Sequence, residues 1–268
     1  MPTQPSTARS RSHSPTSRDD RLKHLARAGL VAYSVVYLMI AWLAIQLALG
    51  DRQGNPSSTG ALRELAQQPL GQALVWAVAL GMFLLALWQA AEAIVGDDGA
   101  GKRLASAGKA VVYAAIGVSG VRVAVGSGSS GKGEETWTAQ LMDLPAGQLL
   151  VGLVGLAIIG FGLFEMYRAW TDKFAEELTH EGRSGSSGTA FLWFGKIGCA
   201  ARGVAFVIVG GLFGYAALTH DAKKSGGLDQ ALYEVLDQPF GPVLLFAIGV
   251  GLACFGLFTL ARARHLRE

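Results

Sequence analysis

Polar side chains inside long apolar runs are the residues of this sequence that could carry chemistry. A charged or amide group placed in hydrocarbon is costly unless another group or water meets it, so such residues mark ion paths, ligand sites or bonds between helices. Two sets recur at matching places along the chain: Gln89, Glu165 and Thr259, and Gln46, Arg122 and Tyr215. The first set should flank a packed helix face near one end of the spans, and the second should lie near the other end.

Glu165 is the carboxylate of the first set, and we expect it to have a basic or hydroxyl partner. Lys109 and Arg202, at the starts of two other spans on the same side of the membrane, are the predicted partners. Two interpretations stay open: the carboxylate joins two helices, or it binds a proton or a ligand. In the first case Glu165→Gln should leave the fold nearly intact, because neutral polar groups occupy the equivalent places. Arg122 lies four residues from the end of its span, where it can snorkel to the interface.

The rest of the sequence holds no pattern of a catalytic, metal or cofactor site. Cys199 and Cys254 lie inside apolar runs, as small buried hydrophobic residues do. The histidines lack the spacing of metal ligands. Paired carboxylates and a nucleophile beside a base are missing too. We therefore expect no enzyme, no cofactor and no metal ion.

Composition places the chain in a membrane. Of its 268 residues 51% are hydrophobic and 16% are charged, whereas soluble domains carry roughly 25% charged residues. A spanning helix needs about 20 residues. Six apolar runs reach that length: Gly29–Gly50, Gln72–Val95, Gly108–Gly126, Gly147–Tyr167, Gly195–Thr219 and Gly241–Ala261. Helices satisfy every backbone group within the segment, so the sequence predicts an all-α integral membrane protein with six transmembrane helices.

Lysine and arginine are distributed unevenly between the two sides of the predicted bundle. Of these residues 17 lie on the side of the two termini and five on the opposite side, with Arg122 inside a span. Positive charge is retained on the cytoplasmic side, so both termini should be cytoplasmic. The Ser- and Arg-rich segment 1–21 is too polar to form a core and should be a disordered cytosolic tail. We expect a multi-pass protein of the plasma membrane.

The chain repeats itself three times, with two helices in each unit. An aromatic residue in the first helix precedes a proline before the second by 32, 32 and 33 residues: Tyr37 and Pro69, Tyr113 and Pro145, Phe206 and Pro239. Since each unit crosses the membrane twice, all three have the same orientation and are parallel repeats. The units cover residues 22–98, 102–178 and 191–268, and a Gly/Ser-rich linker covers residues 179–190.

Small residues recur every seven positions in all six predicted helices. Residues seven apart share one helix face, and close approach of small residues drives helix association in lipid. We therefore expect this small-residue stripe to face protein, with helices crossing at about 20°. It comprises Ser34, Ala41, Ala48, Ala79, Ala86, Ala93, Ala110, Gly117, Ala124, Gly155, Gly162, Ala169, Gly203, Gly210, Ala217, Gly249, Gly256 and Ala263.

Each connection on the outer side carries a short amphipathic segment before its proline. These segments cover residues 61–66, 141–145 and 231–236. They should lie on the outer surface or cap the bundle, with Trp137 and Tyr233 as interfacial anchors. Proline is well suited to the first turn of a helix, so each proline should begin the next span.

These features resemble a membrane family known as domain of unknown function 1206. Each of its three tandem units opens with a basic residue, Gly, two aliphatic residues, Tyr, three apolar residues and Gly. Two openings fit with one substitution each: Arg202, Gly203, Phe206 and Gly210, and Lys109, Ala110, Tyr113 and Gly117. The first unit departs most, since Tyr33 replaces the basic residue and Ser34 and Ala41 replace glycines. The resemblance covers about residues 22–266. It implies an actinobacterial plasma-membrane protein and brings no established activity.

The sequence favours a non-enzymatic protein with a structural or interaction role. Its environment is the lipid bilayer, its partner would be another membrane protein or a second copy, and no feature points to nucleic acid. The alternative is a permease or channel for a small solute or ion along the axis between the repeats. Polar residues at repeat-equivalent sites favour that alternative. Against it, these residues lie near the ends of the spans, with mainly Gly, Ala and aliphatic residues between them.

Overall fold

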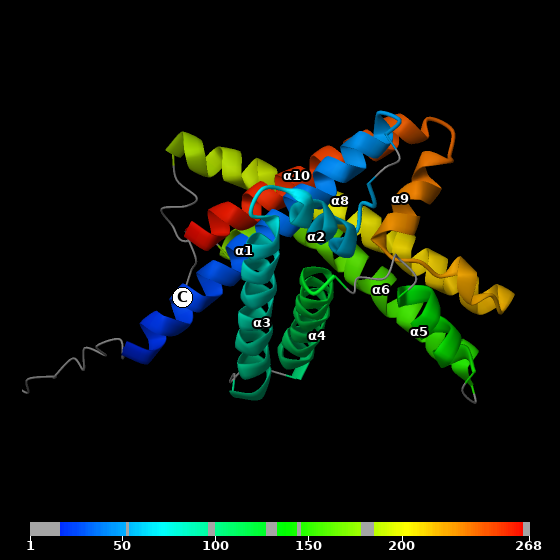
Figure 1. The fold of residues 1–268 in the computed structure, drawn as a ribbon, viewed down its shortest axis with the longest axis horizontal. Coiled ribbons are helices and arrows are strands. Elements are labelled where there is room, and N and C mark those ends of the chain that lie inside the picture. The colour runs from blue at the N-terminus through cyan, green and yellow to red at the C-terminus, as the bar shows by residue number, and fades with distance from the viewer. Residues whose placement is uncertain are drawn as a thin grey trace, which may run out of the picture.

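The computed structural model describes residues 17–51, 54–95, 100–126, 133–143, 146–177 and 185–264. Within these residues every regular element is a helix (Figure 1). The α-helices are α1 (Ser17–Ala48), α2 (Ser58–Gln67), α3 (Gly71–Val95), α4 (Ala100–Ala124), α5 (Gly133–Met142), α6 (Gly147–Trp170), α8 (Gly185–Thr219), α9 (Leu228–Leu236) and α10 (Gly241–Arg264). Two short 3₁₀ helices, η1 (Lys173–Glu177) and η2 (Ala222–Lys224), follow α6 and α8.

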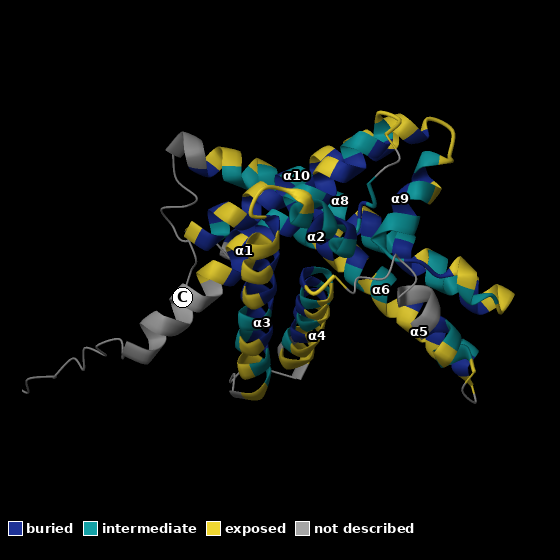
Figure 2. Ribbon diagram, viewed as in Figure 1, coloured by how far each residue is buried: buried dark blue, intermediate teal, exposed yellow. Residues whose placement is uncertain are grey.

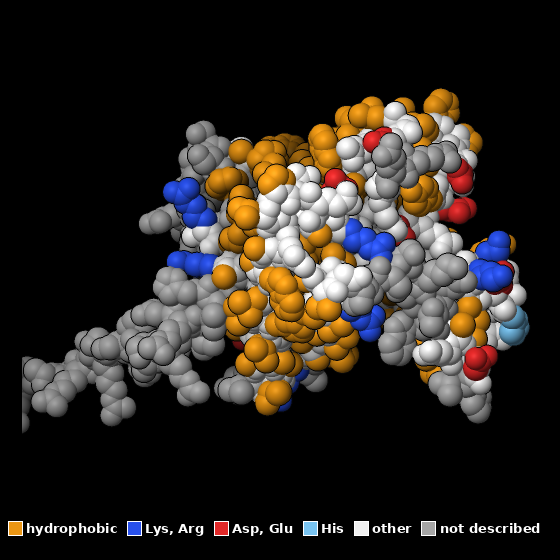
Figure 3. Space-filling model, viewed as in Figure 1, with side chains coloured by type: hydrophobic (Ala, Val, Ile, Leu, Met, Phe, Trp, Pro, Cys, Tyr) orange, Lys and Arg blue, Asp and Glu red, His pale blue; other side chains and the backbone are white. Residues whose placement is uncertain are grey.

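Six of the described helices are long and apolar enough to cross a membrane. Their spans are Arg27–Ala48, Gly71–Ile94, Arg103–Ala124, Gly147–Trp170, Gly188–Thr219 and Gly241–Arg264. The expected number and positions of the apolar helices are thereby confirmed. Apolar side chains gather on the outside of α3 and α4 (Figure 3), as lipid contact requires.

Three helices begin well before the sequence predicts, among them α4, which starts at Ala100 rather than Gly108. Helix α1 starts at Ser17, inside the segment 1–21 that we expect to be a tail. Helix α8 starts at Gly185, so the second half of the predicted linker 179–190 is helical and the rest lies outside the described residues. Propagating an existing helix is far easier than nucleating one, so a stable span extends into flanking residues of poor propensity.

The long helices pack most extensively in three pairs that join neighbouring repeats. Helix α3 packs against α4, α6 against α8, and α10 against α1. Figure 1 shows the α1–α10 and α6–α8 pairs crossing each other, while α3 lies beside α4. Each pair unites the second helix of one repeat with the first helix of the next, and the last pair unites the two ends of the chain. The packing unit is therefore offset by one helix from the sequence repeat.

The small-residue stripe lies inside these three pairs. All its members are buried except Ala48 and Ala93, which are half-buried (Figure 2). A Cβ atom built on Gly210 would lie 2.6 Å from the Gly155 carbonyl oxygen, and one on Gly162 would lie 2.7 Å from that of Gly203. In the α1–α10 pair the Ser34 hydroxyl donates to the Gly256 carbonyl at 2.7 Å. Small side chains thus allow backbone-to-backbone approach, the main route to helix association in lipid.

The two long helices of a repeat pack against each other in the first and third repeats, but not in the second, within the described residues. Helix α1 packs against α3, and α8 packs against α10. The equivalent pair in the second repeat, α4 and α6, is not packed together within the described residues. The six long helices therefore form a ring that is open between α4 and α6, and Figure 1 shows these two helices diverging.

The predicted amphipathic segments 61–66 and 231–236 lie in the short helices α2 and α9, whereas segment 141–145 overlaps α5 only at the last two residues of that helix and residues 144–145 lie outside the described part of the chain. The prediction that each proline begins a span is wrong at Pro69 and Pro239, which lie two residues before α3 and α10; Pro145 lies outside the described residues. At both sites the residue after proline has positive φ, and the amide of the next glycine donates to the carbonyl three residues before that glycine, which closes a tight turn.

Gly71 explains why these turns place glycine after the strained residue. Leu70 has φ of 63°, a left-handed conformation costing about 1–2 kcal/mol in L-residues. A Cβ on Gly71 would collide with the Leu65 carbonyl oxygen of the preceding short helix. Because of this crowding, glycine occupies position 71, where the backbones approach closely. The left-handed position 70 is occupied by a residue with a side chain.

Candidate functional site

Five helices bring aromatic and charged side chains together beside the small-residue stripe. Helix α6 presents Phe161, Glu165 and Arg168, which lie on one face because they are four and three residues apart. The same spacing of four places Arg202 above Phe206 on α8 and Tyr33 above Tyr37 on α1. With Phe255 of α10 and Tyr113 of α4 these residues form what we call the arginine cluster: Tyr33, Tyr37, Tyr113, Phe161, Glu165, Arg168, Arg202, Phe206 and Phe255.

Glu165 lies between two arginines. It is only 2% exposed, and its Oε1 accepts a hydrogen bond from Arg168 Nη1 at 3.0 Å. Its Oε2 lies 3.5 Å from Arg202 Nη1, an ion pair between α6 and α8. The structure thus places Arg202, one of the two predicted partners, at the carboxylate. Lys109 lies half-buried on α4.

The guanidinium of Arg202 is surrounded by aromatic rings. It lies 4.6 Å from the ring centroid of Phe255, 5.2 Å from Phe206, 5.4 Å from Phe161 and 5.5 Å from Tyr37. Its Nε donates to the Tyr37 hydroxyl at 3.1 Å. Arginine suits this site because its planar, weakly hydrated cation can stack on rings and still donate in its own plane.

The tyrosines extend the arginine cluster towards α4. The Tyr33 hydroxyl donates to that of Tyr37 at 3.3 Å. The ring of Tyr33 meets Tyr113 edge to face, with centroids 5.0 Å apart, and Tyr37 meets Phe255 in the same way at 4.8 Å. Edge-to-face contacts add to the energy of burial and fix ring orientation. Side chains from α1, α4, α6, α8 and α10 are therefore coupled in one rigid group.

The chemistry available to this arrangement is limited. A guanidinium is not deprotonated in proteins, so Arg168 and Arg202 cannot pass a proton along the chain of hydrogen bonds. The two arginines balance the buried carboxylate and leave one positive charge in excess. Among the described residues, no group of three His, Cys, Asp or Glu side chains could hold a metal ion. The geometry fits fixed charges that join helices.

The other predicted polar residues are dispersed over the three helix pairs. Gln89 and Thr259 are buried on α3 and α10, and the Thr259 hydroxyl donates to the Phe255 carbonyl of its own helix at 2.8 Å. Gln46 is half-buried on α1, Arg122 is exposed in the last turn of α4, and Tyr215 is exposed on α8. Each set spans three separate pairs, so neither forms one site.

Sequence reasoning missed Arg168 and the rings around Arg202. Arg168 lies three residues after Glu165, a spacing at which helix side chains meet. The repeat alignment places Tyr33 at the same position as Lys109 and Arg202, the predicted partners of a carboxylate. The alignment therefore indicated that Tyr33 lies near this group. Phe161 and Phe255 also occupy equivalent places, but aromatic residues are common on lipid-facing surfaces, so their role was not visible from type alone.

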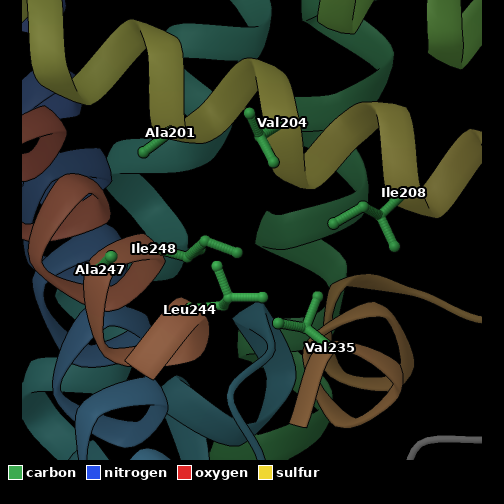
Figure 4. A pocket seen from close by; sticks show the side chains of 7 residues that line it. All are labelled: Ala201, Val204, Ile208, Val235, Leu244, Ala247 and Ile248. Atoms are coloured by element: carbon green, nitrogen blue, oxygen red, sulfur yellow. The ribbon is translucent and has the colours of Figure 1, made fainter. Parts of the chain in front are cut away.

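An apolar cavity of about 320 Å³ lies apart from the arginine cluster, between α8, α9 and α10 (Figure 4). Its lining consists only of aliphatic side chains: Ala201, Val204, Ile208, Val235, Leu244, Ala247 and Ile248. Solute sites combine an apolar wall with a few polar groups that fix orientation. This cavity has none, so it suits hydrocarbon and offers no handle to a polar solute.

Comparison with known proteins places the chain in a family. A curated protein of Bacillus subtilis (strain 168), "Uncharacterized protein YxxB", is 28% identical over 248 residues, covering 90% of each chain. No solved structure matches. The family described as Domain of Unknown Function (DUF1206) matches residues 28–96, 104–172 and 197–265, each range a pair of long helices. The actinobacterial origin stays a prediction. With three tandem copies covering most of its length, the chain belongs to the DUF1206 family of multi-span membrane proteins.

Proposed function

We propose that this protein is a non-enzymatic structural or interaction protein of the plasma membrane. The observation that carries the proposal is the complete engagement of Arg202. Four rings, the Tyr37 hydroxyl and the Glu165 carboxylate occupy its surroundings. A binding or transport site keeps its charged groups available to a ligand, whereas these charges already bind each other and join α1, α6, α8 and α10.

The energetic argument supports a structural role. Taking two charges out of water costs several kcal/mol per ion, and mutual attraction offsets this only when the remaining donors and acceptors are also satisfied. Here aromatic faces and a second arginine surround the pair, while Glu165 Oε2 makes its ion pair without a hydrogen bond among the described residues. Such a group is sensitive to geometry, so it favours one arrangement of the helices over alternatives.

Transport measurements separate this proposal from the permease or channel alternative. We expect vesicles containing the purified protein to take up labelled ions and small neutral solutes no faster than protein-free vesicles. We also expect Glu165→Gln to lower thermal stability, because Arg168 and Arg202 would lose their counterion. This differs from the expectation formed without the structure, since the neutral residues at equivalent places have no such pair of arginines.

Uptake above the protein-free rate would contradict the structural proposal if Glu165→Gln abolished it without changing stability. Arg202→Lys serves as the matched variant, because it keeps the charge and loses the planar fork. If the role is structural, Arg202→Lys should destabilise the protein and leave vesicle permeability unchanged.

We further propose that both termini are cytoplasmic. The 17-to-5 distribution of lysine and arginine supports this orientation. Gln68 and Gln238 are exposed before α3 and α10, and Thr171 is exposed after α6. Cysteines introduced at the two glutamines should react with an impermeant reagent in intact cells. A cysteine at Thr171 should react only after permeabilisation, and the opposite pattern would reverse the orientation.

A further inference from the structure

The second repeat exposes helix faces that the first and third repeats bury. On α4, Val112 is 49% exposed, whereas its repeat equivalents Val36 and Ala205 are 1% and 2% exposed. The latter two lie on α1 and α8, which pack against the second helices of their own repeats. The exposed position on α4 is therefore the one at which a second helix is missing.

Helix α6 shows the complementary difference. Val154 is 40% exposed, while its equivalents Val78 and Ile248 on α3 and α10 are 6% and 9% exposed. The residues of α6 that face its partner α8, such as Gly155 and Gly162, are buried as in the other pairs. The face of α6 on which a first helix is missing is thus exposed, whereas the same face of α3 and of α10 is buried.

Small residues needed for close packing are present on both exposed faces. In the first repeat a Cβ on Gly81 would lie 2.6 Å from Ala32 Cβ, and in the third repeat Gly251 meets Ala201 in the same way. The equivalent residues are Gly108 on α4 and Ala157 on α6. Both are exposed, and a Cβ built on Gly108 would meet nothing within 4 Å.

We propose that these two faces form an interface between two copies of this chain. We name them the open faces: Ala105, Gly108 and Val112 on α4, and Val154, Ala157 and Phe161 on α6. Helix α4 of one copy packs against α6 of the other, as α1 packs against α3 and α8 against α10 within a chain. The inference does not depend on the function proposed above, because a permease could dimerise through the same faces.

Symmetry favours a second copy over another partner. The α4 open face fits a second helix of a repeat, and the α6 open face fits a first helix. A copy related by a two-fold axis presents both missing helices at once, so each contact occurs twice in a closed dimer. Lipid alone would leave Gly108 and Ala157 without the close helix approach that their equivalents make in the first and third repeats.

Cross-linking between differently tagged copies tests the proposal. In a background with Cys199 and Cys254 replaced by alanine, one copy carries Gly108→Cys and the other Ala157→Cys. Oxidation in membranes should give a mixed, reducible dimer. The matched control is Ala32→Cys with Gly81→Cys: on separate copies it should give no mixed dimer, and on one chain it should cross-link within the monomer.

Two outcomes would overturn the proposal. Cross-linking of Gly108→Cys with Ala157→Cys only when both are on one chain would show that the ring closes on itself. An absence of cross-linking in either arrangement, with the control pair reacting, would assign the open faces to lipid.

If the variant without Cys199 and Cys254 does not accumulate, the dimer can be tested by a measurement that needs no introduced cysteines. Photobleaching of fluorescently tagged protein in lipid vesicles should show two copies per complex for the unmodified sequence. Gly108→Leu should reduce this to one. Gly211→Leu should leave two copies, because its Cβ would also meet nothing within 4 Å but lies on α8, away from the open faces. Single copies of the unmodified protein would refute the dimer.

Discussion

Interfaces between repeats and interfaces within repeats differ in how completely the chain makes them. All three contacts between repeats are present, each with the small-residue stripe inside it, but α4 and α6 of the second repeat are not packed together within the described residues. Glycine backbones approach each other in the α6–α8 contact of the first class, while in the α1–α3 contact of the second class Gly29 faces the side chain of Leu85. The duplicated sequence unit is therefore not the unit that packs. The following substitutions test whether contacts between repeats contribute more to stability than contacts within repeats.

The largest effect is expected at Arg202, where the α6–α8 contact between repeats carries the buried ion pair. Arg202→Met should lower the free energy of unfolding by roughly 3 kcal/mol, because it leaves Glu165 with one counterion and removes the cation from four rings. Thermal unfolding in a mild detergent measures the loss. Phe161→Leu serves as a control that keeps both charges, and an equal loss there would attribute the effect to packing alone.

A smaller effect is expected from overpacking the same pair. Gly210→Leu should destabilise the protein by about 1–3 kcal/mol, because its Cβ would press on the Gly155 carbonyl oxygen. The adjacent Gly211 meets no atom within 4 Å of a built Cβ, so Gly211→Leu should leave thermal stability unchanged. Equal effects of the two substitutions would show that the stripe does not determine packing.

The contact within repeats should respond differently in the first and second repeats. Gly81→Leu should lower stability by about 1–2 kcal/mol, since it would displace Ala32 of α1. Ala157→Leu at the equivalent place should leave the unfolding of the isolated protomer unchanged, because α4 does not cover it. Unfolding monitored under conditions that keep single copies measures both. A loss at Ala157 equal to that at Gly81 would mean that the second repeat is closed.

The smallest effect concerns a hydrogen bond at the opposite end of two pairs. Gln148 donates to the Ala217 carbonyl at 2.6 Å, and its equivalent Gln72 donates to Ala124 at 2.8 Å. Gln148→Leu should cost about 1 kcal/mol, because a carbonyl at the end of α8 loses its partner. Pro242 occupies the third equivalent place and cannot make this bond. Unchanged thermal unfolding would show that water replaces the side chain.

Much of this architecture could be predicted because its causes are local in sequence. The apolar length of each run fixes the spans, and the period of seven in Gly155, Gly162 and Ala169 fixes the face that is buried. The pairing of helices could not be predicted, since a small-residue stripe does not specify its partner. Ser34 and Gly256 meet across almost the whole chain, and periodicity holds no information about such a distance.

The candidate site was predictable only in part for a similar reason. Opposite charges on the same side of the membrane led from Glu165 to Arg202. The four rings that enclose the guanidinium come from α8 itself and from three other helices, and hydrophobic type alone does not distinguish a ring beside a cation from one beside lipid. The turn at Gly71 was also beyond prediction, because the proline rule for helix starts takes no account of the Leu65 carbonyl.

The α1–α10 pair has a consequence for how the protein is made. An arginine at the centre of a single helix costs roughly 3 kcal/mol to insert in a membrane. Glu165 is synthesised before Arg202 and lies in the preceding span, so α6 and α8 can enter as a hairpin in which Arg202 already has a carboxylate partner. By contrast, α1 precedes the other five described spans and its stripe waits for α10, the last of the six. Only a chain translated as far as α10 can cover Ser34 and Ala41, so α1 meets its partner only after the four spans between them have been made.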